Sequence, residues 1–117
     1  MSSLEPELRE LLDWFVERDA PWAGTAREAL RDTQVLGVCG CGCGTLRLRV
    51  ADSVDVSSLP RPLPVEGLAP TPVGVVNVQL WIEPSRALLE LVWTPEPAQP
   101  PLAPRAAELE LAPWSRR

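Results

Sequence analysis

Residues 73–93 read VGVVNVQLWIEPSRALLELVW, and this stretch decides the fold. Its first half alternates with a period of two, which is typical of a β-strand with one buried face. Val76, Val78, Leu80 and Ile82 share one face of this strand, and Asn77, Gln79 and Trp81 share the other. A turn follows at residues 83–86, with Pro84 in its second position, and residues 87–93 form the return strand. The stretch predicts an antiparallel hairpin.

A second hairpin is predicted upstream, around the segment GVCGCGCG at residues 37–44. Residues 45–50 alternate, with leucine and valine expected inward and Arg47 and Arg49 outward. Residues 35–39 are also compatible with a strand. A single strand from 39 to 50 would place the thiols on the arginine face, so we expect a bulge or turn at Gly42 or Gly44. The simplest arrangement is a hairpin with the cysteines at its bend.

Two helices are predicted before these strands. Residues 4–18 carry apolar side chains at helical spacing, with Ser3 as N-cap and Pro6 in the first turn. A shorter helix, residues 26–32, is predicted from a capping box in which the Thr25 hydroxyl and the Glu28 carboxylate each accept a backbone N–H bond. Both helices offer an apolar face for packing on the sheet.

The remaining segments show weak patterns and many prolines. Residues 51–71 are expected to form an extended connection with a short edge strand near Val65, and residues 94–117 a proline-rich tail docked on or extending from the domain. The sequence therefore predicts one α+β domain at residues 1–93. Its two N-terminal helices pack on an antiparallel sheet of about four strands, built from two hairpins.

Composition excludes several classes of function. The chain has 117 residues, a net charge of −5 and no histidine, and all eleven of its basic residues are arginine. An acidic chain without a basic face does not favour nucleic-acid binding. The absence of histidine and lysine removes the commonest general base, the commonest zinc ligand and Schiff-base chemistry. No apolar run is long enough to span a membrane, and the N-terminus does not resemble a secretory signal. We expect a cytoplasmic protein that is not an enzyme.

All three cysteines, Cys39, Cys41 and Cys43, lie in one alternating Cys-Gly segment. Three readings stay open. The thiols pack as small apolar residues, or they form a redox pair, or they curl to hold Cu(I), or zinc with a fourth ligand from elsewhere. The nearest acidic residues in sequence are Asp52 and Asp55. The sequence predicts a candidate metal site at the cysteines, with zinc or copper as the cofactor.

Five tryptophans are many for a chain of this length, and tryptophan is enriched at interface hot spots. Trp114, in a polar end of the chain, and Trp22, just before the second helix, are the candidate partner-binding residues. For Trp22, packing over the junction of the two helices is the alternative. Trp14, Trp81 and Trp93 are expected to fill a core that lacks tyrosine.

Four stretches carry a likeness to known sequences: ALRDTQV at 29–35, CGCGC at 39–43, LRLRV at 46–50 and ALLELVW at 87–93. Their order resembles a group of small uncharacterised proteins from GC-rich bacteria, chiefly actinobacteria. The likeness covers roughly residues 4–93 and departs at Gly44-Thr45, where the group tends to have Pro-Ser. The group has no established activity, so the resemblance implies the layout of the chain and leaves function open.

Two functions follow from these observations. The first is a small non-enzymatic interaction or accessory protein that recognises another protein, with a homodimer compatible with the sequence. The alternative is a metal- or thiol-handling protein with a Cu(I) or zinc site at Cys39, Cys41 and Cys43.

Overall fold

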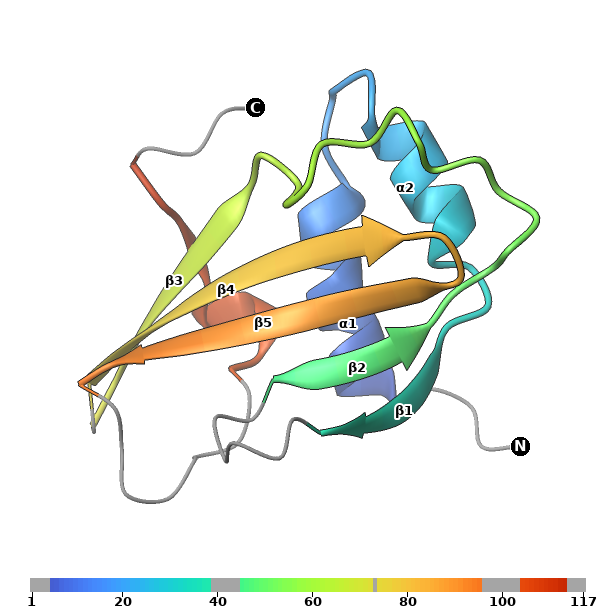
Figure 1. Ribbon diagram of the computed structural model, residues 1–117. Helices are drawn as coiled ribbons and strands as arrows, with labels where there is room; N and C mark the ends of the chain where they lie inside the picture. The colour runs from blue at the N-terminus through green and yellow to red at the C-terminus, as the bar shows by residue number, and fades with distance from the viewer. Residues whose placement is uncertain (1–4, 39–44, 73, 96–103, 114–117) are drawn as a thin grey trace.

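A computed structural model describes residues 5–38, 45–72, 74–95 and 104–113 (Figure 1). These residues form two α-helices, a short 3-10 helix and six strands. They are α1 (Pro6–Val16), α2 (Ala23–Ala29), β1 (Gln34–Val38), β2 (Leu46–Arg49), β3 (Glu66–Thr71), β4 (Gly74–Glu83), β5 (Arg86–Thr94), η1 (Ala106–Glu108) and β6 (Glu110–Leu111). Among these helices, none is both long and apolar enough to cross a membrane.

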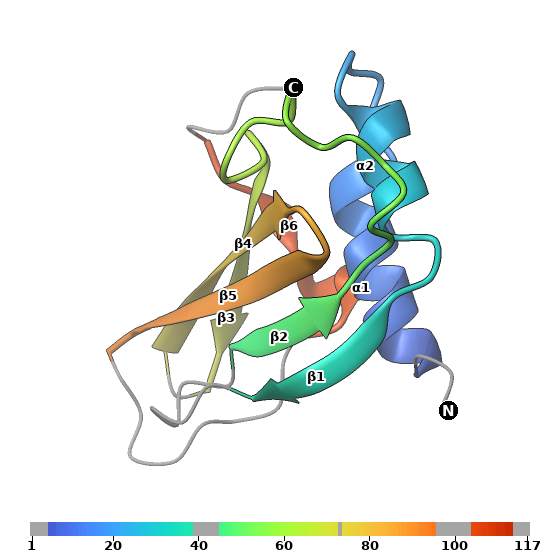
Figure 2. The ribbon, with the colours of Figure 1, turned by 45° about the vertical axis from the view of Figure 1, so that its right-hand side comes forward.

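The strands form one sheet in the order β1-β2-β5-β4-β3-β6, and every neighbouring pair is antiparallel. The two predicted hairpins, β1–β2 and β4–β5, are confirmed and meet through the pairing of β2 with β5. Both helices lie on one face of the sheet (Figure 2). We call the helix-covered face the inner face and the opposite one the outer face.

The core lies between the helices and the inner face. The helices bury Leu11, Leu12, Phe15, Val16, Ala26 and Ala29. The central strands bury one alternating face each: Val76, Val78, Leu80 and Ile82 of β4, and Ala87, Leu89 and Leu91 of β5. Because burying a large apolar side chain contributes roughly 1.5–3 kcal/mol, this layer accounts for most of the driving force for folding.

The prediction of about four strands is wrong, because the sheet has six, although the fold is still α+β. The two strands beyond the four are β3 and β6, from segments with proline and little alternation. β3 begins next to Val65, where a short edge strand is expected, but it lies inside the sheet between β4 and β6. β3 contains Pro70, and β6 is only two residues long. Each strand forms because a neighbour supplies its hydrogen-bond partners, and sequence propensity alone does not register that contribution.

Pro70 is tolerated in β3 because of where its nitrogen points. The Ala112 amide donates to the Glu66 carbonyl, so the even-numbered residues of β3 direct their backbone groups toward β6. β6 pairs only with Gly67 and Leu68 and ends before Pro70. The missing N–H of Pro70 therefore removes no bond to β4.

Two glycines have spatial roles. Gly74, at the start of β4, has a φ of +137°, and a Cβ there would lie 2.6 Å from the Thr94 carbonyl oxygen. A Cβ on Gly67 would lie 3.0 Å from Leu109 and 3.2 Å from Trp14. Gly67 thus lets α1 and the C-terminal segment approach β3 closely.

The helix boundaries differ from the sequence prediction. Residue Glu5 is the N-cap of α1, with Pro6 at the first helical position, and Ser3 lies outside the described residues. Helix α2 begins at Ala23, so Thr25 lies inside it, and the predicted capping box is wrong. The helix extends N-terminally because Ala23 is buried against the core and Trp22 packs partly against it.

The segment between β2 and β3 is an ordered connection that runs past α2 (Figures 1 and 2). It buries Val56, Leu59 and Leu63. The Arg61 Nε donates to the Ile82 carbonyl at 3.1 Å and ties the connection to β4. Hydrophobic anchors separated by prolines produce this arrangement without a strand or helix period, which explains the weak sequence pattern.

Candidate functional site

The cysteines predicted as a metal or thiol site, Cys39, Cys41 and Cys43, lie outside the described residues. Both ends of their segment are described: β1 ends at Val38, whose register partner is Leu46, the first residue of β2. The segment therefore joins two neighbouring strands. Within the described part of the chain, no cluster of three or more Cys, Asp and Glu side chains is placed to hold a metal ion.

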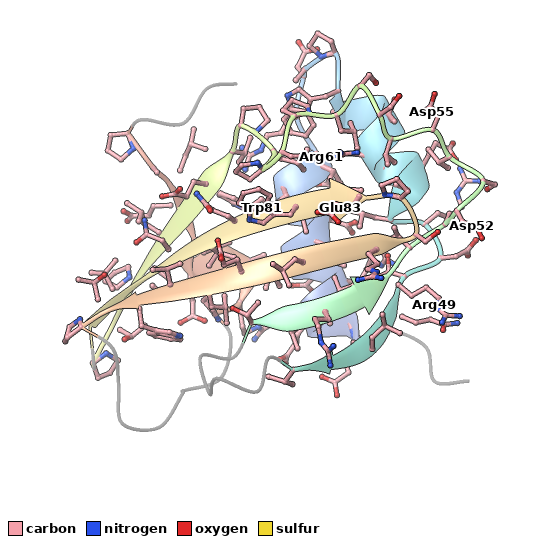
Figure 3. All side chains as sticks on the ribbon, viewed as in Figure 1. Arg49, Asp52, Asp55, Arg61, Trp81 and Glu83 are labelled. Carbon is pink, nitrogen blue, oxygen red and sulfur yellow. The ribbon has the colours of Figure 1, made fainter. Side chains whose placement is uncertain are left out.

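Asp52 and Asp55 follow the opposite end of β2 from the cysteine segment, and Figure 3 shows both along the connection to β3. The Ser57 hydroxyl and amide, which bond the carboxylate, hold the pKa of Asp55 below its usual value. This is the geometry of a local turn. Extending the β2–β5 register by one residue instead places Glu90 opposite Thr45, at the cysteine end. Glu90 was not a candidate in the sequence because it lies far from the cysteines along the chain and comes near them only through the pairing of β2 with β5.

The tryptophans occupy three environments. Trp22 is the N-cap residue of α2 and packs partly against the core, and Trp114 lies outside the described residues. Trp93 is buried in the core, and Trp14 packs against the core from its border. The ring of Trp14 meets that of Phe15 edge-to-face, with the two centroids 4.9 Å apart. The core expectation is wrong for Trp81, which lies on the outer face beside Arg61 and Glu83 (Figure 3).

The outer face carries a polar cluster over β3 and β4. The side-chain amides of Asn77 and Gln79 both donate to the carboxylate of Glu66, the first at 2.7 Å. Around this cluster lie half-buried Leu68, Trp81 and Leu88, with Val75 and Val92 exposed. The Trp81 indole Nε1 is buried and finds no acceptor among the described residues. The outer face is therefore amphipathic and is not an ordinary solvated surface.

Strand β1 forms an open edge of the sheet. Among the described strands it pairs only with β2. Its three large apolar side chains are all exposed: Val35 by 49%, Leu36 by 48% and Val38 by 54%. The strand has no proline or charged residue, which proteins commonly use to protect an edge, and only a register irregularity between Val35 and Gly37 interrupts it.

The pairing of β1 with β2 shows which backbone N–H and C=O groups of β1 point away from β2. The Val50 amide donates to the Ser85 carbonyl, so the even-numbered residues of β2 face β5 and the odd-numbered ones face β1. Gln34 and Gly37, the partners of Arg49 and Arg47, therefore share hydrogen bonds with β2. By the same alternation, the backbone groups of Val35 and Val38 point to the open side of the sheet.

Three exposed arginines lie on the outer face next to this edge: Arg47, Arg49 and Arg86. We call them the arginine corner. Arg49 and Arg86 are direct register partners, and none of the three forms an ion pair within the described part of the chain. A Cβ on Gly37 would lie 3.1 Å from an Arg47 guanidinium nitrogen, so this cation extends over β1 itself. A shallow hollow of about 220 Å³ between Leu36, Arg49 and Arg86 continues the surface.

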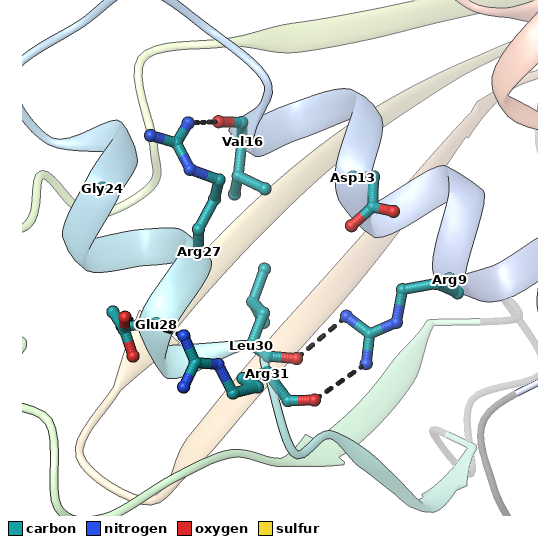
Figure 4. Close-up of a pocket in the computed structure, with 8 residues that line it drawn as sticks. All are labelled: Arg9, Asp13, Val16, Gly24, Arg27, Glu28, Leu30 and Arg31. Atoms are coloured by element: carbon teal, nitrogen blue, oxygen red, sulfur yellow. Dashed lines mark hydrogen bonds and ion pairs between the residues drawn. The ribbon is translucent and has the colours of Figure 1, made fainter.

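A larger hollow of about 490 Å³ lies between α1 and α2 and is lined by Arg9, Arg27 and Arg31 (Figure 4). These arginines are engaged. Arg9 donates to the Leu30 carbonyl at 2.9 Å, and Arg27 donates to the Val16 carbonyl at 2.8 Å. Each helix thus caps the C-terminus of the other, which satisfies orphan carbonyls and opposes the helix dipole. The hollow is explained by helix packing.

Comparisons with models of known protein families, with curated proteins and with solved structures found no match. The resemblance drawn from the Cys-Gly segment and its neighbouring strands therefore stays a prediction. Function has to be argued from the surfaces of the molecule.

Proposed function

We propose that this chain is a cytoplasmic, non-enzymatic interaction protein, which binds another protein through β1 and the adjoining outer face of its sheet. The observation that carries this proposal is the open edge of β1, where Val35, Leu36 and Val38 are each about half exposed. A free row of backbone groups flanked by apolar side chains is a ready template for another strand.

The rest of the molecule supports the same reading. The hollow between the helices is bordered by Arg9 and Arg27, which cap helix ends, and by Arg31, which pairs with Glu28. The carboxylate of Glu66 is held by two amides, and the carboxylate of Asp55 belongs to a turn. In contrast, the β1 edge combines apolar surface with arginines that form no ion pair to any described residue, which is the composition of a protein interface.

Site-specific crosslinking tests this function. A photoreactive residue at Val38 should crosslink a specific protein in extracts of the native cells, whereas the same residue at Glu7, exposed on α1, should not. Adding Leu36→Asp to the Val38 reporter should abolish the product, because a charge would be placed within the apolar contact. Equal crosslinking from Val38 and Glu7, or none from either, would contradict the proposal.

A thiolate metal site is the second candidate function, and one observation favours it. The cysteines lie in sequence between Val38 and Leu46, which are register partners at one end of β1 and β2, and a carboxylate near that end can supply the fourth ligand of a zinc site. Glu90, opposite Thr45, is the described carboxylate best placed by register to complete such a site.

Elemental analysis of protein purified without a histidine tag tests this candidate. The metal reading expects about one zinc or copper per chain, lost in Cys41→Ser and weakened in Glu90→Gln. Asp52→Asn is the matched control, since it removes a carboxylate at the other end of β2. Metal-free protein with three reactive thiols would exclude the candidate.

A further inference from the structure

The chemistry around β1 identifies the kind of partner, given the proposed function. We propose that β1 binds an extended acidic segment of another protein, in which apolar residues alternate with aspartate or glutamate. The segment would add as a seventh strand beside β1. Its apolar side chains would cover Val35 and Val38, and its carboxylates would meet the arginine corner.

The backbone supplies the first part of the argument. Val35 and Val38 direct their N–H and C=O groups away from β2, so an added strand gains hydrogen bonds without disrupting the existing ladder. Their side chains face the inner side, because their register partners are Leu48 and Leu46, which are respectively buried and packed on the core. The residues of the segment that face this side would therefore have to be apolar. The two that meet Val35 and Val38 would lie three apart, because the register is irregular between Val35 and Gly37.

Charge supplies the second part. The other alternate residues of an added strand would face the outer side, next to Gln34 and Gly37. Gly37 has no side chain, and the Arg47 guanidinium extends over it. A neighbouring strand lies only about 4.8 Å farther out, so its outward carboxylates come within reach of that cation. The arginine corner is a local positive surface on a chain whose net charge is −5, and carboxylates of a partner would complement its charge.

A second copy of the chain fits less well. Paired through β1, it would bring its own Arg47 toward that of the first, so like charges would face each other across the new pair of strands.

Peptide binding to the full chain tests the proposal. The probes are a labelled nine-residue peptide that alternates valine with glutamate and carries one extra glutamate at its centre, a matched peptide with lysine in place of glutamate, and the glutamate peptide methylated at alternate backbone nitrogens. Fluorescence anisotropy should detect the glutamate peptide alone, and binding should weaken with salt. Arg47→Glu combined with Arg49→Glu should weaken it about tenfold and allow the lysine peptide to bind.

Two further variants control for fold and charge. Val38→Pro removes an amide that faces the open side, so it should abolish peptide binding and leave the thermal unfolding midpoint nearly unchanged. Arg105→Glu makes one such charge reversal beside β6, half the change of the double variant, and should leave binding unaffected.

The inference would be overturned if the glutamate and lysine peptides bound equally well, or if neither peptide bound. So would a dimer in sedimentation that Val38→Pro dissociates, since a second copy would then be the occupant. The crosslinking test addresses the proposed function, and the peptide test addresses the chemistry of the partner. A crosslinked protein at Val38 without peptide selectivity would overturn the acidic partner alone, whereas the absence of both signals would remove the proposed function as well.

Discussion

At one edge of the sheet the chain covers its own backbone, whereas at the other edge it leaves β1 open. Beside β3, the two-residue strand β6 pairs with Gly67 and Leu68, and Leu109 packs into the space that Gly67 leaves. At the other edge, the five-residue strand β1 pairs with β2 on one side and with no described strand on the other, and it exposes three apolar side chains. Among the described strands, only the β3 edge is covered by another strand.

The difference shows what each edge contributes. The β6 edge belongs to the core, because Leu109 and Ala112 are buried and η1 contacts α1. The β1 edge contributes little burial, and the like-charged neighbours Arg49 and Arg86 act against stability. An edge that lowers the stability of the free protein and stays open is best explained by a partner that completes it.

The largest expected effect compares one apolar side chain from each edge. Leu109→Ala should lower the free energy of unfolding by about 2–4 kcal/mol, since it leaves a cavity between β3 and α1. Val38→Ala should change it by no more than about 0.5 kcal/mol, because that side chain is already exposed. Urea unfolding measures both. Comparable losses would mean that the β1 edge is part of the folded core, contrary to the comparison.

A smaller effect is expected from adding one methyl group. Gly67→Ala should destabilise the protein by about 1–3 kcal/mol, because the new Cβ would press on Leu109 and Trp14. Gly24→Ala is the matched control. It lies at an exposed position of α2, where a Cβ would meet only the Arg27 guanidinium at an ordinary contact distance of 3.9 Å, so it should stabilise by about 0.5–1 kcal/mol. Calorimetric midpoints that move in the same direction would refute the close packing of the β6 edge.

The smallest effect concerns the arginine corner. Arg49→Gln should raise the free energy of unfolding by about 0.2–1 kcal/mol, because it removes repulsion from Arg86. Arg47→Gln, whose partners across the sheet are Gly37 and Leu88, should have no such benefit. The stabilisation should shrink in high salt, which screens exposed charges. If Arg49→Gln destabilises at low salt, the corner is part of a stabilising network and is not held free for a partner.

The sequence was sufficient for the two hairpins of this fold and insufficient for the edge formed by β3 and β6. The alternation from Val76 to Ile82 predicts β4 because its inner face is buried along its whole length. In β3, Gly67 and Pro70 break the alternation: Gly67 allows the close approach of Leu109 and Trp14, and Pro70 is tolerated because β6 ends before it. β6 has two residues and no period at all.

The candidate site was only partly predictable for a related reason. The outward direction of Arg47 and Arg49 follows from strand alternation and is confirmed. Their proximity to Arg86 requires the pairing of β2 with β5, which joins residues about forty apart in sequence. That β1 lies at an edge also depends on strand order, and order is not encoded in any local pattern.

The most direct test of the account is amide hydrogen exchange at single residues of β1, with and without the glutamate peptide. In the free protein, we expect the Val35 and Val38 amides to exchange fast and the Gly37 amide, bonded to β2, to exchange slowly. The peptide should slow exchange at Val35 and Val38 and leave Gly67 and Leu111, at the β6 edge, unchanged. Slow exchange at Val35 and Val38 in the free protein, or no response to the peptide, would contradict an open, partner-binding edge.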